Sequence, residues 1–186
     1  MAAACCLKDF DAEPEADISS EDGVNPNHIA DTKTAVFLTG FQTSEKQKVL
    51  IPIFCMQAFR VLMHHAEYDF VHCVLPEHVT LLLDELPNIG FIPELCQYIS
   101  TCGSYGISVI MAAQTANQLK NLYHETADEI VNKCAAIVLL NAEKSTIESI
   151  GRNLPKDTLK QLPDDHCLVF IQDMPVTMDK KIRENI

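Results

Sequence analysis

Basic residues are scarce in this sequence. It has 14 lysines and arginines against 26 aspartates and glutamates, which gives a formal net charge of −12. Eight of the acids lie in residues 1–31, where Lys8 is the single basic residue, so this segment carries a net charge of −7. Non-specific DNA binding depends on lysine and arginine side chains that neutralise phosphates. The composition therefore excludes a protein that coats DNA unaided, and any DNA contact must be local or belong to an assembly.

The sequence also lacks a phosphate-binding loop. The spacing G-x-x-x-x-G-K-[ST] occurs nowhere in the 186 residues, and residues 40–46, which begin with a glycine and end with a lysine, do not fit it. Such a loop supplies backbone N–H groups and a lysine to the phosphates of a nucleotide. A chain without it is expected to bind Mg²⁺-nucleotide poorly by itself.

Signals for secretion, membrane insertion and metal binding are missing as well. The N-terminus MAAACCLKDF has neither the basic start nor the long apolar core of a secretory signal. The longest apolar stretch, residues 49–63, is interrupted by Gln57 and Arg60 and falls short of the roughly 20 residues that a membrane span needs. The eight cysteines form no C-x-x-C pair, so we expect reduced thiols inside the cell. A metal site could also be sought at a cluster of histidine and cysteine residues, His64, His65, His72 and Cys73. Their spacing matches no zinc pattern, so we expect these side chains to be solvated.

What the sequence does contain is an apolar run that stops at two adjacent carboxylates. Residues 79–90 read VTLLLDELPNIG, and a short apolar run without alternation predicts a strand of a parallel sheet covered on both faces. Ligands of such sheets collect beyond the carboxyl ends of the strands, where Asp84 and Glu85 would stand. In nucleotide-hydrolysing folds the first such acid helps to hold Mg²⁺ and the second polarises the attacking water. The alternative is a loop that begins at the two acids, with the Pro, Asn and Gly of residues 87–90 completing a turn.

Strand and helix patterns alternate along the rest of the chain. Residues 9–31 are too poor in apolar side chains to build a core and are read as a flexible connector. Besides the central run, strands are predicted over residues 34–39, 107–113, 135–140 and 167–171, and helices over residues 44–68, about 93–102, and from Thr126 and Ser145. Pro163 and Pro175 flank the last strand, which we expect at the border of the sheet. The alternation predicts an α/β domain with a mostly parallel sheet and helices on both faces.

Gln114 directly follows the strand predicted for residues 107–113. Thr115 and Gln118 have the spacing of a capping box, which accounts for Thr115 as a helix start without any ligand. The capping box does not account for the presence of Gln114 at the end of this strand.

Several separately placed blocks occur in one order: LLLDE at 81–85, NIG at 88–90, IPEL at 92–95, GISV at 106–109, and then Gln114, Gln118, Leu119 and Tyr123. With Asn132, Cys134 and LPDDHCLVFI at 162–171, they resemble the coupling-protein ATPases of type IV secretion and conjugation, the TraG/TraD-like family, over roughly residues 32–182. The resemblance implies a RecA-like P-loop NTPase half-domain of the FtsK/HerA type in residues 32–186. Its Walker B strand is present and its Walker A loop is absent, and residues 1–31 form an acidic flexible lead-in.

The resemblance also implies roles for three residues and a set of ligands. Asp84 would hold Mg²⁺ and, through it, ATP, Glu85 would activate water, and Gln114 would sense the terminal phosphate. The implied activity is ATP-driven DNA translocation by a homo-hexamer that links a DNA–relaxase substrate to a type IV secretion channel, at the cytoplasmic face of the cell membrane. The implied partners are the relaxase or an accessory DNA-processing protein and the channel, with DNA bound only within the assembly.

A second hypothesis comes from a different class of protein. Because the phosphate loop is missing, this chain is expected to be inactive alone, and it could be a truncated coupling protein that acts as a non-catalytic module docking an accessory protein. Residues 102–106 read CGSYG where relatives often carry arginines, so the resemblance does not supply the source of an arginine finger.

Overall fold

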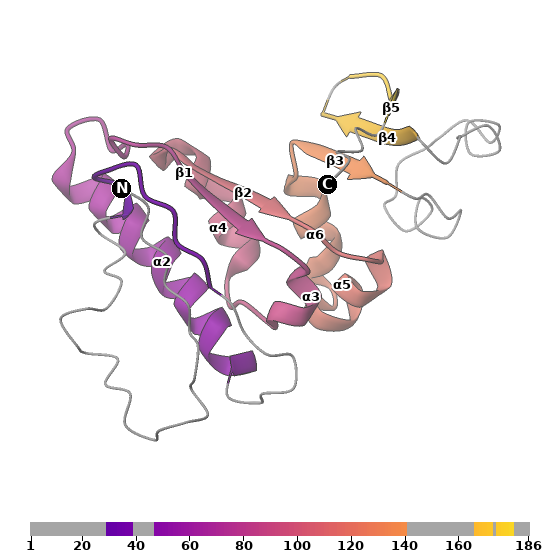
Figure 1. Cartoon of the computed structure of the whole chain (residues 1–186), viewed down its shortest axis with the longest axis horizontal. Helices are drawn as coiled ribbons and strands as arrows, with labels where there is room; N and C mark the ends of the chain where they lie inside the picture. The colour runs from indigo at the N-terminus through magenta and orange to yellow at the C-terminus, as the bar shows by residue number, and fades with distance from the viewer. Residues whose placement is uncertain (1–28, 39–46, 141–165, 173, 181–186) are drawn as a thin grey trace. The chain divides into compact units, whose positions relative to one another are not determined.

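The computed structural model of the chain describes residues 29–38, 47–140, 166–172 and 174–180 (Figure 1). These residues belong to two compact units, one within residues 1–112 and the other within residues 113–186. Each unit has its own helices and its own small sheet.

The first unit is built on two parallel strands, β1 (Val79–Leu83) and β2 (Ile107–Met111). They pair in register from Val79 with Ile107 to Leu83 with Met111. Parallel strands need a crossover connection, which here consists of α3 (Leu86–Ile89), α4 (Leu95–Thr101) and the 3₁₀ turn η1 (Cys102–Tyr105). The central strand predicted from the apolar run is therefore confirmed, and it ends directly before Asp84.

The helix α2 (Gln47–Asp69) supplies much of the core of the first unit. Its Phe59, Leu62 and Ala66 are at most 1% exposed. The ring of Phe59 stacks on the ring of Tyr98 in α4, with centroids 4.8 Å apart. The predicted helix is thus confirmed, while its predicted cap, Ser44, lies outside the described residues.

By length and composition alone, α2 could also cross a membrane over Val49–Asp69. The sequence predicts no such segment, because its longest apolar stretch ends at residue 63. The helix, however, continues to Asp69. Of the most apolar window of α2, 33% is buried inside the structure. The helix also carries Arg60 and His65, whose side chains form ion pairs with other parts of this unit. One face of α2 therefore packs against the first unit, while most of this window is not buried.

The described part of the N-terminal segment, residues 29–38, packs on the first unit without joining its sheet. Ala30 is fully buried, and its carbonyl accepts a hydrogen bond of 3.2 Å from the backbone N–H of Glu77. Residues 34–38 belong to no strand, so the core strand predicted for 34–39 is wrong over its described residues. An apolar run favours a strand only where a partner strand comes within hydrogen-bonding distance, and that partner is set by tertiary structure.

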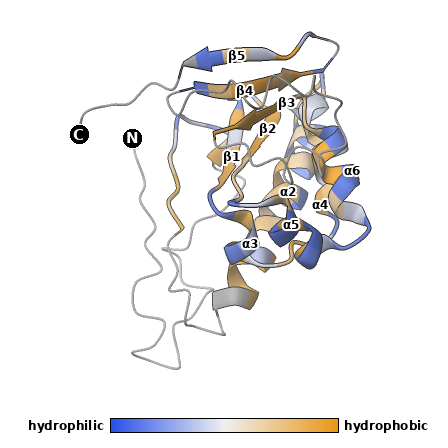
Figure 2. Cartoon of the chain, turned by 90° about the vertical axis from the view of Figure 1, so that its right-hand side faces the viewer, coloured by the Kyte–Doolittle hydropathy of each residue, from blue (hydrophilic) through white to orange (hydrophobic). Residues whose placement is uncertain are grey.

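The second unit combines two short helices with an antiparallel sheet. The helices are α5 (Ala116–Tyr123) and α6 (Thr126–Lys133). The sheet has the order β3 (Ala136–Leu139), β4 (His166–Ile171), β5 (Thr177–Lys180). In Figure 2 β3 and β4 are coloured mainly as hydrophobic, whereas β5 ends in hydrophilic residues.

The α/β class and the parallel strand pair are confirmed, but the second unit differs from the expectation in two respects. Its strands are antiparallel. The sequence did not predict this, because the apolar pattern of a strand does not reveal the direction of its neighbour. The strand predicted at the border, β4, is central, since Pro175 lies in the connection to β5 and interrupts no pairing. Pro163 and the helix predicted from Ser145 lie outside the described residues.

Candidate functional site

The two acidic residues of the central motif follow β1 immediately, at its carboxyl end. Asp84 is exposed and Glu85 is half-buried. The chain around them is fixed by Ala112, the residue after β2: its N–H donates to the carbonyl of Leu83 at 3.1 Å, and its carbonyl accepts from the N–H of Leu86 at 2.9 Å. The ends of both parallel strands are thereby held together, and the two carboxylates project from the edge at which ligands of parallel sheets collect.

Glu85 is held by the short helix that follows it. Its backbone is left-handed, with φ 54° and ψ 53°, and it stands at the N-cap position of α3. Its carbonyl accepts hydrogen bonds from the N–H groups of Asn88 at 2.7 Å and Ile89 at 3.3 Å. The side-chain amide of Asn88 also donates to Oε2 of Glu85 at 2.5 Å. Residues 86–89 thus form a short helix instead of the loop considered as the alternative to a ligand site, and this helix fixes the backbone of Glu85.

A cavity of about 1050 Å³ opens beside this end of β1. Its walls are β1, one side of α2 and the extended residues 32–38, and Asp84, Glu85 and Asn88 lie along it. Most of the lining is apolar, and burial raises the pKa of the Cys55 thiol in its wall to about 11. All six cysteines in the described part of the chain are free.

Gln114, the third predicted site residue, belongs to the second unit. It is exposed and precedes the cap of α5. The predicted capping box is present: the N–H of Gln118 donates to Oγ1 of Thr115, and the N–H of Thr115 donates to Oε1 of Gln118, each at 3.2 Å. Of the three predicted site residues, the structure thus brings Asp84 and Glu85 together, and Gln114 lies two residues beyond Ala112 along the chain.

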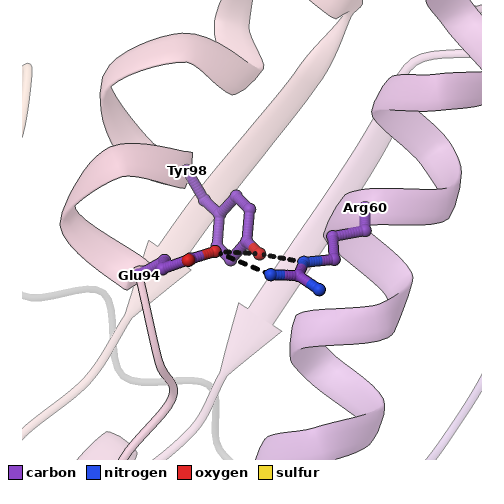
Figure 3. A network of polar contacts seen from close by, with 3 residues as sticks. All are labelled: Arg60, Glu94 and Tyr98. Atoms are coloured by element: carbon purple, nitrogen blue, oxygen red, sulfur yellow. Dashed lines mark hydrogen bonds and ion pairs between the residues drawn. The ribbon is translucent and has the colours of Figure 1, made fainter.

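A polar cluster that sequence reasoning missed joins α2 to the start of α4 (Figure 3). Arg60 donates through Nε to the hydroxyl of Tyr98 at 3.0 Å and through a terminal nitrogen to Oε2 of Glu94 at 3.1 Å. The Tyr98 hydroxyl donates to the same oxygen of Glu94 at 3.0 Å. The hydrogen bond from Arg60 lowers the pKa of Glu94, while burial raises the pKa of Tyr98. Only the spacing of Glu94 and Tyr98 on one helix face carries a sequence signal, since Arg60 is 34 residues away from Glu94.

A second polar cluster lies at the end of α2. His65 contacts Asp69 through Nδ1 at 2.6 Å and Asp31 through Nε2 at 3.1 Å. The carboxylates raise the pKa of His65, with Asp31 as the largest cause, against an opposing effect of burial. Within the described residues, no three His, Cys, Asp or Glu side chains gather in a way that could hold a metal ion.

Comparison with known proteins places these residues in context. Residues 78–162 match a family model described as the TraM recognition site of TraD and TraG. None of the curated proteins matches the chain.

Solved structures of one protein share the fold. The plasmid coupling protein TrwB in complex with ADP and Mg²⁺ matches with a TM-score of 0.62 and 17% identity, over 88% of this chain and 44% of that one. The bacterial conjugative coupling protein TrwBdeltaN70, in an unbound form, matches with a TM-score of 0.61 and 15% identity, over 87% and 44% of the two chains. This likeness shows that the chain shares the fold of the matched part of TrwB. The chain spans less than half of the length of the TrwB chains that it matches.

Proposed function

Since residues 78–162 of this chain match the family model of the TraM recognition site of TraD and TraG, we propose that the protein is part of a coupling ATPase of conjugative DNA transfer. Such an assembly links a DNA–relaxase substrate to a type IV secretion channel and moves DNA at the expense of ATP. The observation that carries the proposal is the position of Asp84 and Glu85 at the carboxyl end of β1, within the matched residues.

The two carboxylates suit different tasks in this proposal. Mg²⁺ is bound by one or two protein carboxylates together with substrate phosphates and water, and the exposed carboxylate of Asp84 fits that requirement. When bound, Mg²⁺ would neutralise charge on the phosphates. Glu85 is half-buried and oriented by α3, as befits a group that accepts a proton from the attacking water. Gln114 would sense the terminal phosphate.

The rest of the nucleotide site must come from residues that this sequence does not contain. A phosphate loop would supply the N–H groups and the lysine that complement the phosphates. We therefore propose that ATP and Mg²⁺ bind within a homo-hexameric assembly at the cytoplasmic face of the cell membrane. The partners of that assembly would be a relaxase or accessory DNA-processing protein and the secretion channel.

The test is ATP turnover by the complete assembly with Glu85→Gln. The substitution keeps the shape of the side chain and removes its basicity, so turnover should fall by at least 100-fold while nucleotide binding is retained. Glu67→Gln is the matched control, because Glu67 is an exposed glutamate on α2. Unchanged turnover in the Glu85 variant would refute the assignment of Glu85.

A second candidate function is favoured by the description of the matching family model. That description concerns recognition of TraM, so the chain could dock an accessory protein without performing chemistry. Titration calorimetry of the chain with Mg²⁺-ATP tests the docking function in one direction, because weak binding by the isolated chain is expected from both functions. Saturable binding by the isolated chain would argue against a purely passive docking module.

A further inference from the structure

Glu85 has a backbone conformation that glutamate rarely adopts. Its φ of 54° and ψ of 53° lie in the left-handed region, which glycine and asparagine tolerate better than glutamate. Such conformations persist where the surrounding contacts impose them, and they cluster at functional sites. The contacts that impose this one are therefore informative.

Part of the constraint comes from the backbone and the core. Leu86, the next residue, is 1% exposed, and its N–H is bonded to the carbonyl of Ala112. The carbonyl of Glu85 accepts the N–H groups of Asn88 and Ile89. These contacts fix where the Cα of Glu85 lies, but they leave the rotation of its side chain undetermined.

The side-chain amide of Asn88 restricts that rotation. It donates to Oε2 of Glu85 at 2.5 Å, and both groups lie along the same cavity. Asn88 is exposed, so this contact is not needed to fill the core. A neutral amide donor suits the task, because it orients a carboxylate without adding the charge of a lysine or arginine.

We propose that Asn88 is a positioning residue for Glu85: its amide holds the carboxylate in the orientation from which Glu85 accepts the proton of the attacking water. The inference rests on the proposed function, because it gives Asn88 a role in the step assigned to Glu85. A general base must lie within hydrogen-bonding reach of its proton, and a small misplacement of a reacting group costs one to two orders of magnitude in rate. Asn88 itself touches neither substrate nor water in this account.

The experiment compares three substitutions of Asn88 in the complete assembly, with kcat and KM for ATP as the readouts. Asn88→Leu keeps the volume and removes the donor, so kcat should fall about 10-fold while KM stays within about two-fold. Asn88→Asp keeps the shape of the side chain but places a second carboxylate against that of Glu85. The two charges repel each other, so kcat should fall further, about 100-fold. Asn88→Gln retains a donor on a longer side chain and should recover part of the loss. Gln97→Leu, the same change at an exposed position of α4, is the control.

The order of the three variants separates positioning from a merely structural role. If Asn88 only fitted the turn, the isosteric aspartate would be tolerated best and the leucine and glutamine variants would behave alike. That order, or wild-type kcat in the leucine and aspartate variants, would overturn the inference. Glu85→Gln measured in parallel shows which claim fails: if Glu85→Gln abolishes turnover and the Asn88 variants do not, only the role of Asn88 is wrong. If Glu85→Gln leaves turnover intact, both claims fail.

Discussion

The guanidinium of Arg60 lies 3.1 Å from the carboxylate of Glu94 and ties α2 to the residue that precedes α4. Both side chains are about half exposed. Solvent screens such a pair, so its main effect is on geometry and on the ionisation of the carboxyl group.

The first prediction concerns that ionisation. Arg60→Met removes the hydrogen bond and the charge that lower the pKa of Glu94, so the pKa of Glu94 should rise toward its ordinary value. The measurement is a titration of the Glu94 carboxyl carbon by NMR in wild-type and variant chains. An unchanged titration midpoint would show that the contact does not form in solution.

The second prediction concerns the pH dependence of stability. Asp31 and Asp69 raise the pKa of His65 above its usual 6.5 in the folded chain, and the ring of Phe70 packs edge-on at 5.0 Å. The folded state then binds a proton more tightly than the unfolded state. The stabilisation is complete below about pH 6.5 and is lost as the pH rises through the raised pKa.

Urea unfolding at pH 6 and pH 8 tests this sign. His65→Gln should lower the free energy of unfolding more at pH 6 than at pH 8, and Asp31→Asn should weaken the same dependence. Comparing each variant with the wild type at the same pH cancels the titration of unrelated groups. Equal losses at the two pH values would contradict the predicted coupling of His65 to the two carboxylates.

The third prediction concerns the core between α2 and α4. Phe59 is completely buried and stacked on Tyr98, so Phe59→Ala should lower the free energy of unfolding by about 3–5 kcal/mol. Val71→Ala is the control, because Val71 is 96% exposed and its truncation should change stability by less than about 0.5 kcal/mol. Similar effects of the two substitutions would mean that Phe59 is not part of a packed core.

The fourth prediction concerns the cap of α5. Thr115→Ala removes the oxygen that accepts from the N–H of Gln118 and should cost about 1 kcal/mol. Thr115→Ser keeps a hydroxyl and should retain most of the stability. Chemical unfolding of both variants is the measurement, and a serine variant as unstable as the alanine variant would argue against the capping box.

Several elements of both units could be predicted because their signals are local. An apolar run that ends in two acids specifies β1 and the position of Asp84 and Glu85. The spacing of Thr115 and Gln118 specifies the cap of α5, since a capping box involves residues three apart. The ordered blocks of the central region indicate a resemblance to the TraG/TraD-like family, and residues 78–162 match a family model of the TraM recognition site of TraD and TraG.

What could not be predicted depends on partners distant in sequence or on rare backbone geometry. The mostly apolar residues 34–38 read as a strand but line a cavity, and no strand in the described part of the chain pairs with them. β5 is short and polar and pairs only because β4 is beside it. In the contact of Asn88 with Glu85, the backbone of Glu85 is in the left-handed region. The amino-acid sequence gives no signal for that conformation at a glutamate.

The central claim, a role in conjugative DNA transfer through a nucleotide site at Asp84 and Glu85, is tested most directly in the source cells. The frequency of DNA transfer is measured after the chromosomal or plasmid copy is changed to Glu85→Gln, with Glu67→Gln as the matched control and protein levels compared by immunoblot. We predict that transfer is lost in the Glu85 variant and retained in the control. Normal transfer by cells that contain only the Glu85 variant would contradict the account.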